Sequence, residues 1–227
     1  MCLAHTQKRP VEWLIDHHDL SKRWCLVHAT HLTQSEIIEL AKSKVTVGLC
    51  PSTEADLGDG LFPLPEFLSQ GGIFGVGSDS NLRVDPAEEL RLLEWGQRLH
   101  HQRRNLAFSK QVIGQVDFGQ SKSQSSALID SLGQSLSLAA IQGGGHAVGR
   151  QTGFMVGAWG DWFTLDKNDP GLNIAQGHYC SDQWVFAKRN NRVQDVYIAG
   201  NQIIVDGQHP LEEKIVTQFT QTLKRLF

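Results

Sequence analysis

Residues 24–50, WCLVHATHLTQSEIIELAKSKVTVGLC, alternate between strand-like and helix-like patterns. Trp24 to His28 is a short apolar run of the kind that forms a buried strand. Thr33 and Glu36 then have the spacing of a capping box, in which each side chain bonds the other residue's backbone N–H at the start of a helix. Val45 to Cys50 is a second apolar run, which suits a strand. The stretch therefore predicts a strand, a helix and a second strand.

Further strand and helix patterns follow along the chain. The Gly/Asp-rich segment after Cys50 predicts a loop, and Pro65 to Gln70 predicts a short helix. Ile73 to Ser78 predicts a third strand. Residues 85–88 (DPAE) supply a cap, a first-turn proline and an N3 carboxylate for a long helix through about His100. Three successive βα units predict parallel strands covered by helices.

The second half of the chain has a different pattern. Residues 111–126 are rich in Gln and Ser, which predicts a surface loop, and residues 128–141 predict a helix. Short strands and a closing helix follow: Trp162 to Leu165, Trp184 to Ala187, a hairpin of Val196 to Ile198 with Ile203 to Val205, and a helix from about Leu211 to Leu223. We therefore expect an α/β part over residues 1–150 and a β-rich module with a terminal helix over residues 151–227.

The composition favours a small-molecule ligand. The 227 residues include 21 Lys and Arg against 24 Asp and Glu, a formal net charge of -3 that gives no field to attract nucleic acid or an anionic membrane. No apolar run approaches the roughly 18 residues of a membrane-spanning helix, and no leader pattern is present at the N-terminus, so we expect a cytoplasmic protein. The four cysteines form no Cys-x-x-Cys pair, and Cys25 and Cys50 are expected to be buried, inert thiols.

Two titratable residues follow apolar strands. His28 closes WCLVH, and Asp79 follows IFGVGS. In a (β/α)8 barrel the active site lies at the C-terminal ends of the strands. An imidazole and a carboxylate at such ends suit the activation of water beside a divalent metal, with the carboxylate as ligand and base. A core histidine and a loop-capping aspartate are the alternative interpretation, and spacing alone leaves both open.

Other polar residues give weaker signals. His31 has His-x-x-His spacing with His28 but is expected in a loop. The run Gln142 to His146 (QGGGH) lacks the Lys-Ser/Thr of a phosphate loop and predicts a structural turn. Carboxylates after Cys50 could line a pocket mouth, although turn chemistry explains them equally well. They are Glu54, Asp56 and Asp59, together with Thr53.

Several strings resemble one known family. Trp24 to His31 (WCLVHATH), Leu49 to Gly60 (LCPSTEADLGDG), Phe74 to Ser80 (FGVGSDS) and Glu88 to Leu99 (EELRLLEWGQRL) are similar to formimidoylglutamate deiminases of the amidohydrolase superfamily. Gly157 to Asp166 and Val196 to Gly207 resemble the closing β-module of that superfamily. The resemblance therefore covers nearly the whole chain.

The resemblance implies a fold, a reaction and a cofactor. Its members are zinc-dependent (β/α)8-barrel hydrolases that convert N-formimidoyl-L-glutamate to N-formyl-L-glutamate and ammonia in histidine degradation, usually as homodimers. It implies that the chain is the C-terminal part of such a barrel followed by the closing module. It also implies that Asp79 is a zinc ligand and the catalytic base, and that His28 lies beside the hydrolytic water. The substrate-binding residues stay unknown, and Arg83 receives no role.

The family's pattern also includes residues that this chain lacks. The family carries a His-x-His pair on its first strand and a further histidine with a nearby glutamate on its fifth, and no His-x-His occurs among the 227 residues. Asp79 and His28 alone cannot complete a tetrahedral zinc site. We therefore expect weak or absent zinc binding by this chain, and activity only when the missing N-terminal half is supplied as a partner.

Two other hypotheses stay open at this point. One is an amidohydrolase-superfamily deaminase or chlorohydrolase acting on a heterocycle. The loop of residues 52–60 favours the formimidoylglutamate deiminase over this hypothesis. The other is a non-catalytic remnant that acts as an interaction module.

Overall fold

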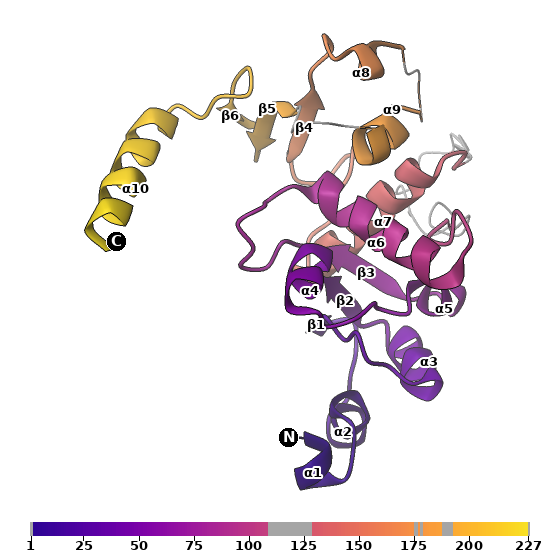
Figure 1. Cartoon of the computed structure of the whole chain (residues 1–227). Helices are drawn as coiled ribbons and strands as arrows, with labels where there is room; N and C mark the ends of the chain where they lie inside the picture. The colour runs from indigo at the N-terminus through magenta and orange to yellow at the C-terminus, as the bar shows by residue number, and fades with distance from the viewer. Residues whose placement is uncertain (1, 109–128, 175–176, 178, 188–192, 227) are drawn as a thin grey trace.

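A parallel sheet and an antiparallel sheet organise the chain (Figure 1). The computed structural model describes residues 2–108, 129–174, 177, 179–187 and 193–226. The first sheet has the order β1 (Cys25–Val27), β2 (Thr46–Leu49), β3 (Ile73–Val76), and both pairings are parallel. The succession of βα units is therefore confirmed. The predicted loop over residues 111–126 falls outside the described residues.

Helices connect the parallel strands and follow the last one. They are α3 (Gln34–Ser43), α4 (Pro51–Leu57), α5 (Leu64–Ser69), α6 (Pro86–His101) and α7 (Leu132–Ala147). The capping box of α3 is confirmed, because Thr33 N donates to the Glu36 carboxylate over 2.7 Å and Thr33 Oγ1 accepts from Glu36 N over 3.3 Å. The side chain of Asp85 caps α6 by accepting from Ala87 N.

Helix α4 corrects the prediction of a loop after Cys50. Pro51 stands at the first helical position, where its fixed φ suits a helix and its missing N–H leaves no donor unpaired. Gly58 ends the helix with a left-handed φ of 70°. The prediction was wrong because the Asp and Gly residues mark only the end of this segment, whereas Pro51 marks its start.

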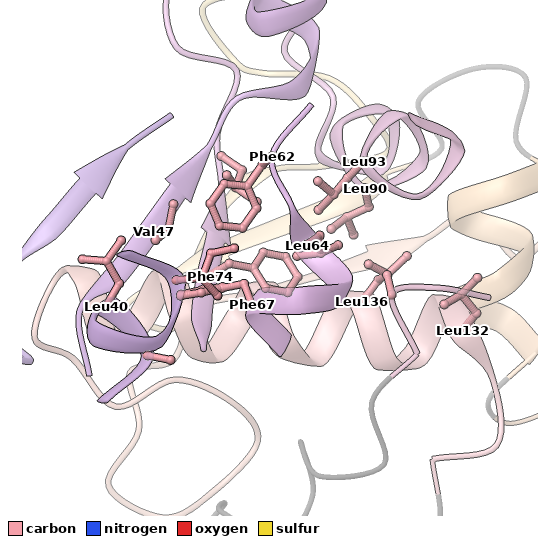
Figure 2. Close-up of a cluster of buried hydrophobic side chains, with 14 of the residues drawn as sticks. Leu40, Val47, Phe62, Leu64, Phe67, Phe74, Leu90, Leu93, Leu132 and Leu136 are labelled. Atoms are coloured by element: carbon pink, nitrogen blue, oxygen red, sulfur yellow. The ribbon is translucent and has the colours of Figure 1, made fainter. Parts of the chain in front are cut away.

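A core lies between the parallel sheet and its helices. Figure 2 shows the large side chains of this cluster converging on one another. Those labelled there are Leu40, Val47, Phe62, Leu64, Phe67, Phe74, Leu90, Leu93, Leu132 and Leu136. Phe62 and Phe67 meet edge to face with ring centroids 5.3 Å apart. The core fixes β2 and β3 relative to α5, α6 and α7.

The glycine run of residues 143–145 lies inside α7 and is not the predicted turn. A Cβ at Gly143 would overlap the carbonyl oxygen of Phe74 on β3, and a Cβ at Gly75 would come within 3.1 Å of Gly144 N. The glycines therefore let α7 pack directly against the backbone of β3. Close packing outweighs their poor helix propensity.

The second sheet has the order β4 (Trp162–Leu165), β5 (Val193–Ile198), β6 (Asn201–Ile204), with antiparallel pairs. The predicted hairpin is confirmed, and its turn uses the positive φ angles of Ala199 and Gly200. The predicted strand Trp184 to Ala187 is wrong. This segment forms a π-helical turn, η2 (Gln183–Ala187), after α8 (Pro170–Ile174) and α9 (Tyr179–Asp182).

The strand predicted at η2 and the buried thiol predicted at Cys25 differ from the structure for separate reasons. Trp184 and Val185 are buried in the core cluster, and a short apolar run can be buried in either a strand or a helix. Cys25 is exposed, contrary to the prediction, because Cys25 and Val27 lie on the uncovered face of β1, whereas Leu26 on the other face packs against the core. Cys50 is buried as expected.

The ends of the chain carry helices. The N-terminal pair is α1 (Cys2–Thr6) and α2 (Pro10–His17), and the chain closes with α10 (Glu212–Leu226). Figure 1 shows α10 away from the parallel sheet. Most of its apolar residues, among them Val216 and Phe219, are more than half exposed. None of the described helices is long and apolar enough to cross a membrane.

Candidate functional site

His28 and Asp79 meet at the C-terminal edge of the parallel sheet. His28 directly follows β1, and Asp79 lies in the loop after β3. Parallel strands end at one edge, so residues that follow them are brought together even when β2 lies between. His28 Nε2 is 3.6 Å from Asp79 Oδ2, and the side chains are 33% and 41% exposed. The site therefore keeps access to solvent.

His28 and Asp79, together with Ala29, have left-handed backbone conformations. The φ angle is 67° at His28, 49° at Ala29 and 52° at Asp79. Non-glycine residues seldom adopt this region, at a cost on the order of 1 kcal/mol or more each. At His28 the surrounding sheet offsets this cost, because His28 N donates to Gly48 O over 2.8 Å and so extends the pairing of β1 with β2. Such backbone angles often occur at functional sites.

Glu54 lies behind His28. His28 Nδ1 is 3.2 Å from Glu54 Oε1, and the same oxygen accepts from Cys50 N over 2.9 Å. Burial raises the pKa of the Glu54 carboxyl, and the hydrogen bonds from Cys50 and His28 oppose that rise. The sequence suggested only a pocket-mouth role for Glu54. Treating Pro51 as the first residue of a helix would have placed this carboxylate one turn after Cys50.

Two further residues of α4 connect it to its neighbours. Thr53 Oγ1 donates to Ser78 O over 2.9 Å, next to Asp79. Ser52 N donates to Glu89 Oε2 on α6 over 2.9 Å, and the Ser52 hydroxyl donates to the other oxygen of the same carboxylate. Burial raises the pKa of Glu89, against the effect of both Ser52 bonds. Helix α4 thus links the backbone before Asp79 to the ring of His28.

Cys50 is close to these carboxylates but is not a nucleophile at neutral pH. Burial first, and then the negative charge of Glu54, raise the pKa of its thiol to about 11. The thiolate is the reactive form of cysteine. Cys50 therefore acts through its backbone N–H, which holds Glu54.

The other candidate residues lie away from the His28–Asp79 contact. His31 is exposed, and its backbone oxygen accepts from Arg9. Asp56 is exposed and accepts from Asn81 Nδ2 over 2.8 Å, which fits a loop contact. Arg83 pairs with Glu88 and is 70% exposed. None of these contacts gives a role in binding a ligand.

The donors at this edge do not complete a zinc site. Among the described residues, no group of three or more His, Cys, Asp or Glu side chains could hold a metal ion. Asp79 and His28 offer two donors, whereas the nearby Glu54 oxygen is engaged by Cys50 N and His28. Structural and catalytic zinc sites use at least three protein ligands. A zinc ion held by Asp79 therefore needs donors beyond those described here.

Comparison with known proteins identifies relatives of this chain. Residues 3–113 match the model of the amidohydrolase family. The chain is 40% identical over 226 residues to formimidoylglutamate deiminase of Pseudomonas aeruginosa, covering 99% of this chain and 46% of the relative. The predicted resemblance is thus confirmed. The chain spans about half the length of the curated relatives that it matches.

Solved structures agree with this relationship. An amidohydrolase from Brucella melitensis is 39% identical with a TM-score of 0.84, and the match covers 99% of this chain and 46% of that one. An adenosine deaminase from Xanthomonas campestris, solved with bound zinc, has a TM-score of 0.77 at 22% identity over 99% of this chain and 47% of its own. The second match shows the fold alone. The chain therefore has the mixed α/β fold of the corresponding part of amidohydrolases.

Proposed function

We propose that this chain, which these matches relate to the amidohydrolases, forms the C-terminal part of a (β/α)8-barrel deiminase. The three parallel strands would be consecutive strands of the barrel, with the closing module after residue 150. Among the described strands β1 lies at the edge of the sheet, and this open edge supports continuation of the sheet by further strands. The observation that carries the proposal is the 3.6 Å approach of His28 and Asp79 at the strand ends.

The proposed reaction is hydrolysis of N-formimidoyl-L-glutamate to N-formyl-L-glutamate and ammonia. Water adds to the formimidoyl carbon and forms the new C–O bond, and the bond from that carbon to its terminal nitrogen breaks to release ammonia. The identity of 40% to the Pseudomonas aeruginosa formimidoylglutamate deiminase supports this substrate. A place in histidine degradation and a cytoplasmic location follow as further predictions.

Asp79 and His28 take different roles in this proposal. The exposed carboxylate of Asp79 accepts a proton from water, and it is also the donor that this chain offers to zinc. His28 Nε2 lies close enough to Asp79 to exchange a proton through the same water or substrate atom. The remaining metal donors and the groups that bind the two substrate carboxylates would come from the N-terminal half of the barrel. A homodimer of the complete protein stays a prediction.

Two alternatives have less support. A deaminase of a heterocycle shares this fold, as the adenosine deaminase match indicates, but that match has 22% identity against 40% for the deiminase. A non-catalytic remnant would not need His28 and Asp79 to lie close together at the strand ends. The retained contacts of His28 with both Glu54 and Asp79 speak against it.

A hybrid protein tests the proposal. The part of the Pseudomonas aeruginosa deiminase that does not align with this chain is joined to residues 1–227, and ammonia release is measured with N-formimidoyl-L-glutamate and with adenosine. Zinc-dependent release from the first substrate alone supports the proposal. Release from adenosine alone would favour the heterocycle deaminase, and no release from either substrate in a folded, zinc-loaded hybrid would favour the remnant.

A further inference from the structure

We propose that Glu54 is a positioning residue that fixes the imidazole of His28 with Nε2 directed toward Asp79. The inference rests on the proposed function for what His28 does there, whereas the orientation of the ring is a property of this chain alone. It adds a third side chain to the predicted pair. The Glu54 side chain is buried and its oxygen bonds Cys50 N and the ring of His28, so its effect on the site passes through His28.

Burial and a backbone hydrogen bond hold the Glu54 carboxylate in place independently of its contact with His28. Its side chain is 5% exposed, and Oε1 accepts from Cys50 N over 2.9 Å, one turn earlier. Pro51 begins α4 directly after Cys50, which sets the direction of this first turn. Because the buried carboxylate has no freedom to turn toward solvent, its oxygen presents a fixed acceptor to His28.

Because a carboxylate can only accept hydrogen bonds, the contact with Glu54 determines which ring nitrogen of His28 carries the proton. An ionised carboxylate oxygen only accepts, so the 3.2 Å contact requires the hydrogen on Nδ1 of His28. In a neutral ring the other nitrogen, Nε2, is then the acceptor. Nε2 is the atom 3.6 Å from Asp79 Oδ2. Glu54 therefore leaves the basic nitrogen of His28 facing the proposed site of proton transfer.

Helix α4 makes this arrangement stiff. Thr53, next to Glu54, bonds the carbonyl of Ser78 in the segment that leads to Asp79. Ser52 joins the start of the helix to Glu89 on α6. One short helix thus holds the ring of His28 by a side chain and the loop of Asp79 by another. A shift of α4 would disturb the two groups together, whereas loss of the Glu54 carboxylate releases only the ring.

Nitrogen-15 NMR of labelled histidine in the 227-residue chain tests the proposal. The spectrum is recorded at a pH well above the ordinary pKa of histidine, and His28→Gln assigns the signal. The expected result is an Nδ1–H tautomer for His28 in the unmodified chain. Glu54→Gln should keep it, because the amide oxygen can accept from both Cys50 N and Nδ1. Glu54→Leu should release the ring to exchange between tautomers.

Glu94→Leu is the matched control, because it removes a fully buried carboxylate that contacts Arg98 and the backbone of residues 106–107. It should leave the His28 signal unchanged. An Nε2–H tautomer in the unmodified chain overturns the proposal, as does a Glu54→Leu spectrum equal to that of the unmodified chain. A Glu94→Leu change as large as that of Glu54→Leu also overturns it.

If Glu54→Leu misfolds, the other two proteins still test the proposal. The unmodified chain and Glu54→Gln must still both show Nδ1–H, and either one lacking it overturns the proposal. The measurement needs no turnover. A hybrid that releases no ammonia would therefore contradict the proposed function while leaving the role of Glu54 intact.

Discussion

The Nε2 atom of His28 lies 3.6 Å from Oδ2 of Asp79, although the two residues follow strands on opposite sides of β2. The distance exceeds that of a direct hydrogen bond. An oxygen atom that bonds one of these groups can also reach the other. The arrangement is therefore suited to share a water or substrate atom, and it depends on the parallel pairing of β1 with β2 and of β2 with β3, which brings the two strand ends together.

Gly143→Ala should destabilise the fold, because the new methyl group would meet the Phe74 carbonyl on β3. Overpacking of this kind costs about 1–3 kcal/mol of unfolding free energy. Gly144→Ala is the control, since nothing lies within 4 Å of a Cβ there. Alanine at this helical position should gain up to about 1 kcal/mol. Urea denaturation measures both, and equal stability of the two variants would contradict the packing of α7.

Glu89→Gln should change how stability depends on pH. Burial raises the pKa of the Glu89 carboxyl above its ordinary value, so its stabilising contribution is present below the unfolded pKa and is lost as pH rises through the folded pKa. Glutamine does not titrate. The unfolding free energy of the unmodified chain should therefore fall relative to Glu89→Gln as pH increases through this interval. Exposed Glu213→Gln is the control, and a difference that grows in the opposite direction would contradict the sign of the shift.

Zinc binding by the isolated chain should be weak, with no deiminase turnover. Among the described residues the proposal gives zinc the single donor Asp79, and even with His28 counted beside it two donors do not complete a zinc site. Metal analysis after dialysis checks the expectation. One tightly held zinc ion per chain would show that donors outside the described contact complete the site without a partner.

His28→Ala in the hybrid should lower ammonia release by about 100-fold or more while most of the zinc stays bound, because the proposal makes His28 a proton-transfer group and not a ligand. His31→Ala is the control, since the side chain of His31 is exposed and the substitution keeps the backbone oxygen that accepts from Arg9. Metal content and rate are measured on the same preparations. Zinc loss as complete as that of an Asp79 variant would assign His28 to the metal instead.

Local patterns in the sequence predicted most of the parallel sheet and its two strand-end residues. The capping box at Thr33 and the cap at Asp85 are local signals, so they could be identified without the fold. His28 and Asp79 could be paired because parallel strands share an edge.

Features that depend on tertiary packing could not be predicted in the same way. The helical state of Gly143 depends on contact with β3, and the burial of Trp184 in a π-helical turn depends on the core cluster that covers it. Exposure of Cys25 depends on which face of β1 packs against the core, and Leu26 lies on that face. The role of Glu54 could be recognised only once α4 was known to be a helix. The Gly and Asp residues at the end of this segment had predicted a loop instead.

Ammonia release by the hybrid carrying Asp79→Asn tests the central claim most directly. Asparagine keeps the size of aspartate but removes its charge and its capacity to accept a proton, so zinc should be weakened and turnover of N-formimidoyl-L-glutamate should fall by about 100- to 10,000-fold. Asp56→Asn is the control, because Asp56 is exposed and accepts from Asn81, and this variant should retain activity. An Asp79→Asn hybrid with the rate and zinc content of the unmodified hybrid would contradict the claim that Asp79 and His28 form the catalytic part of this chain.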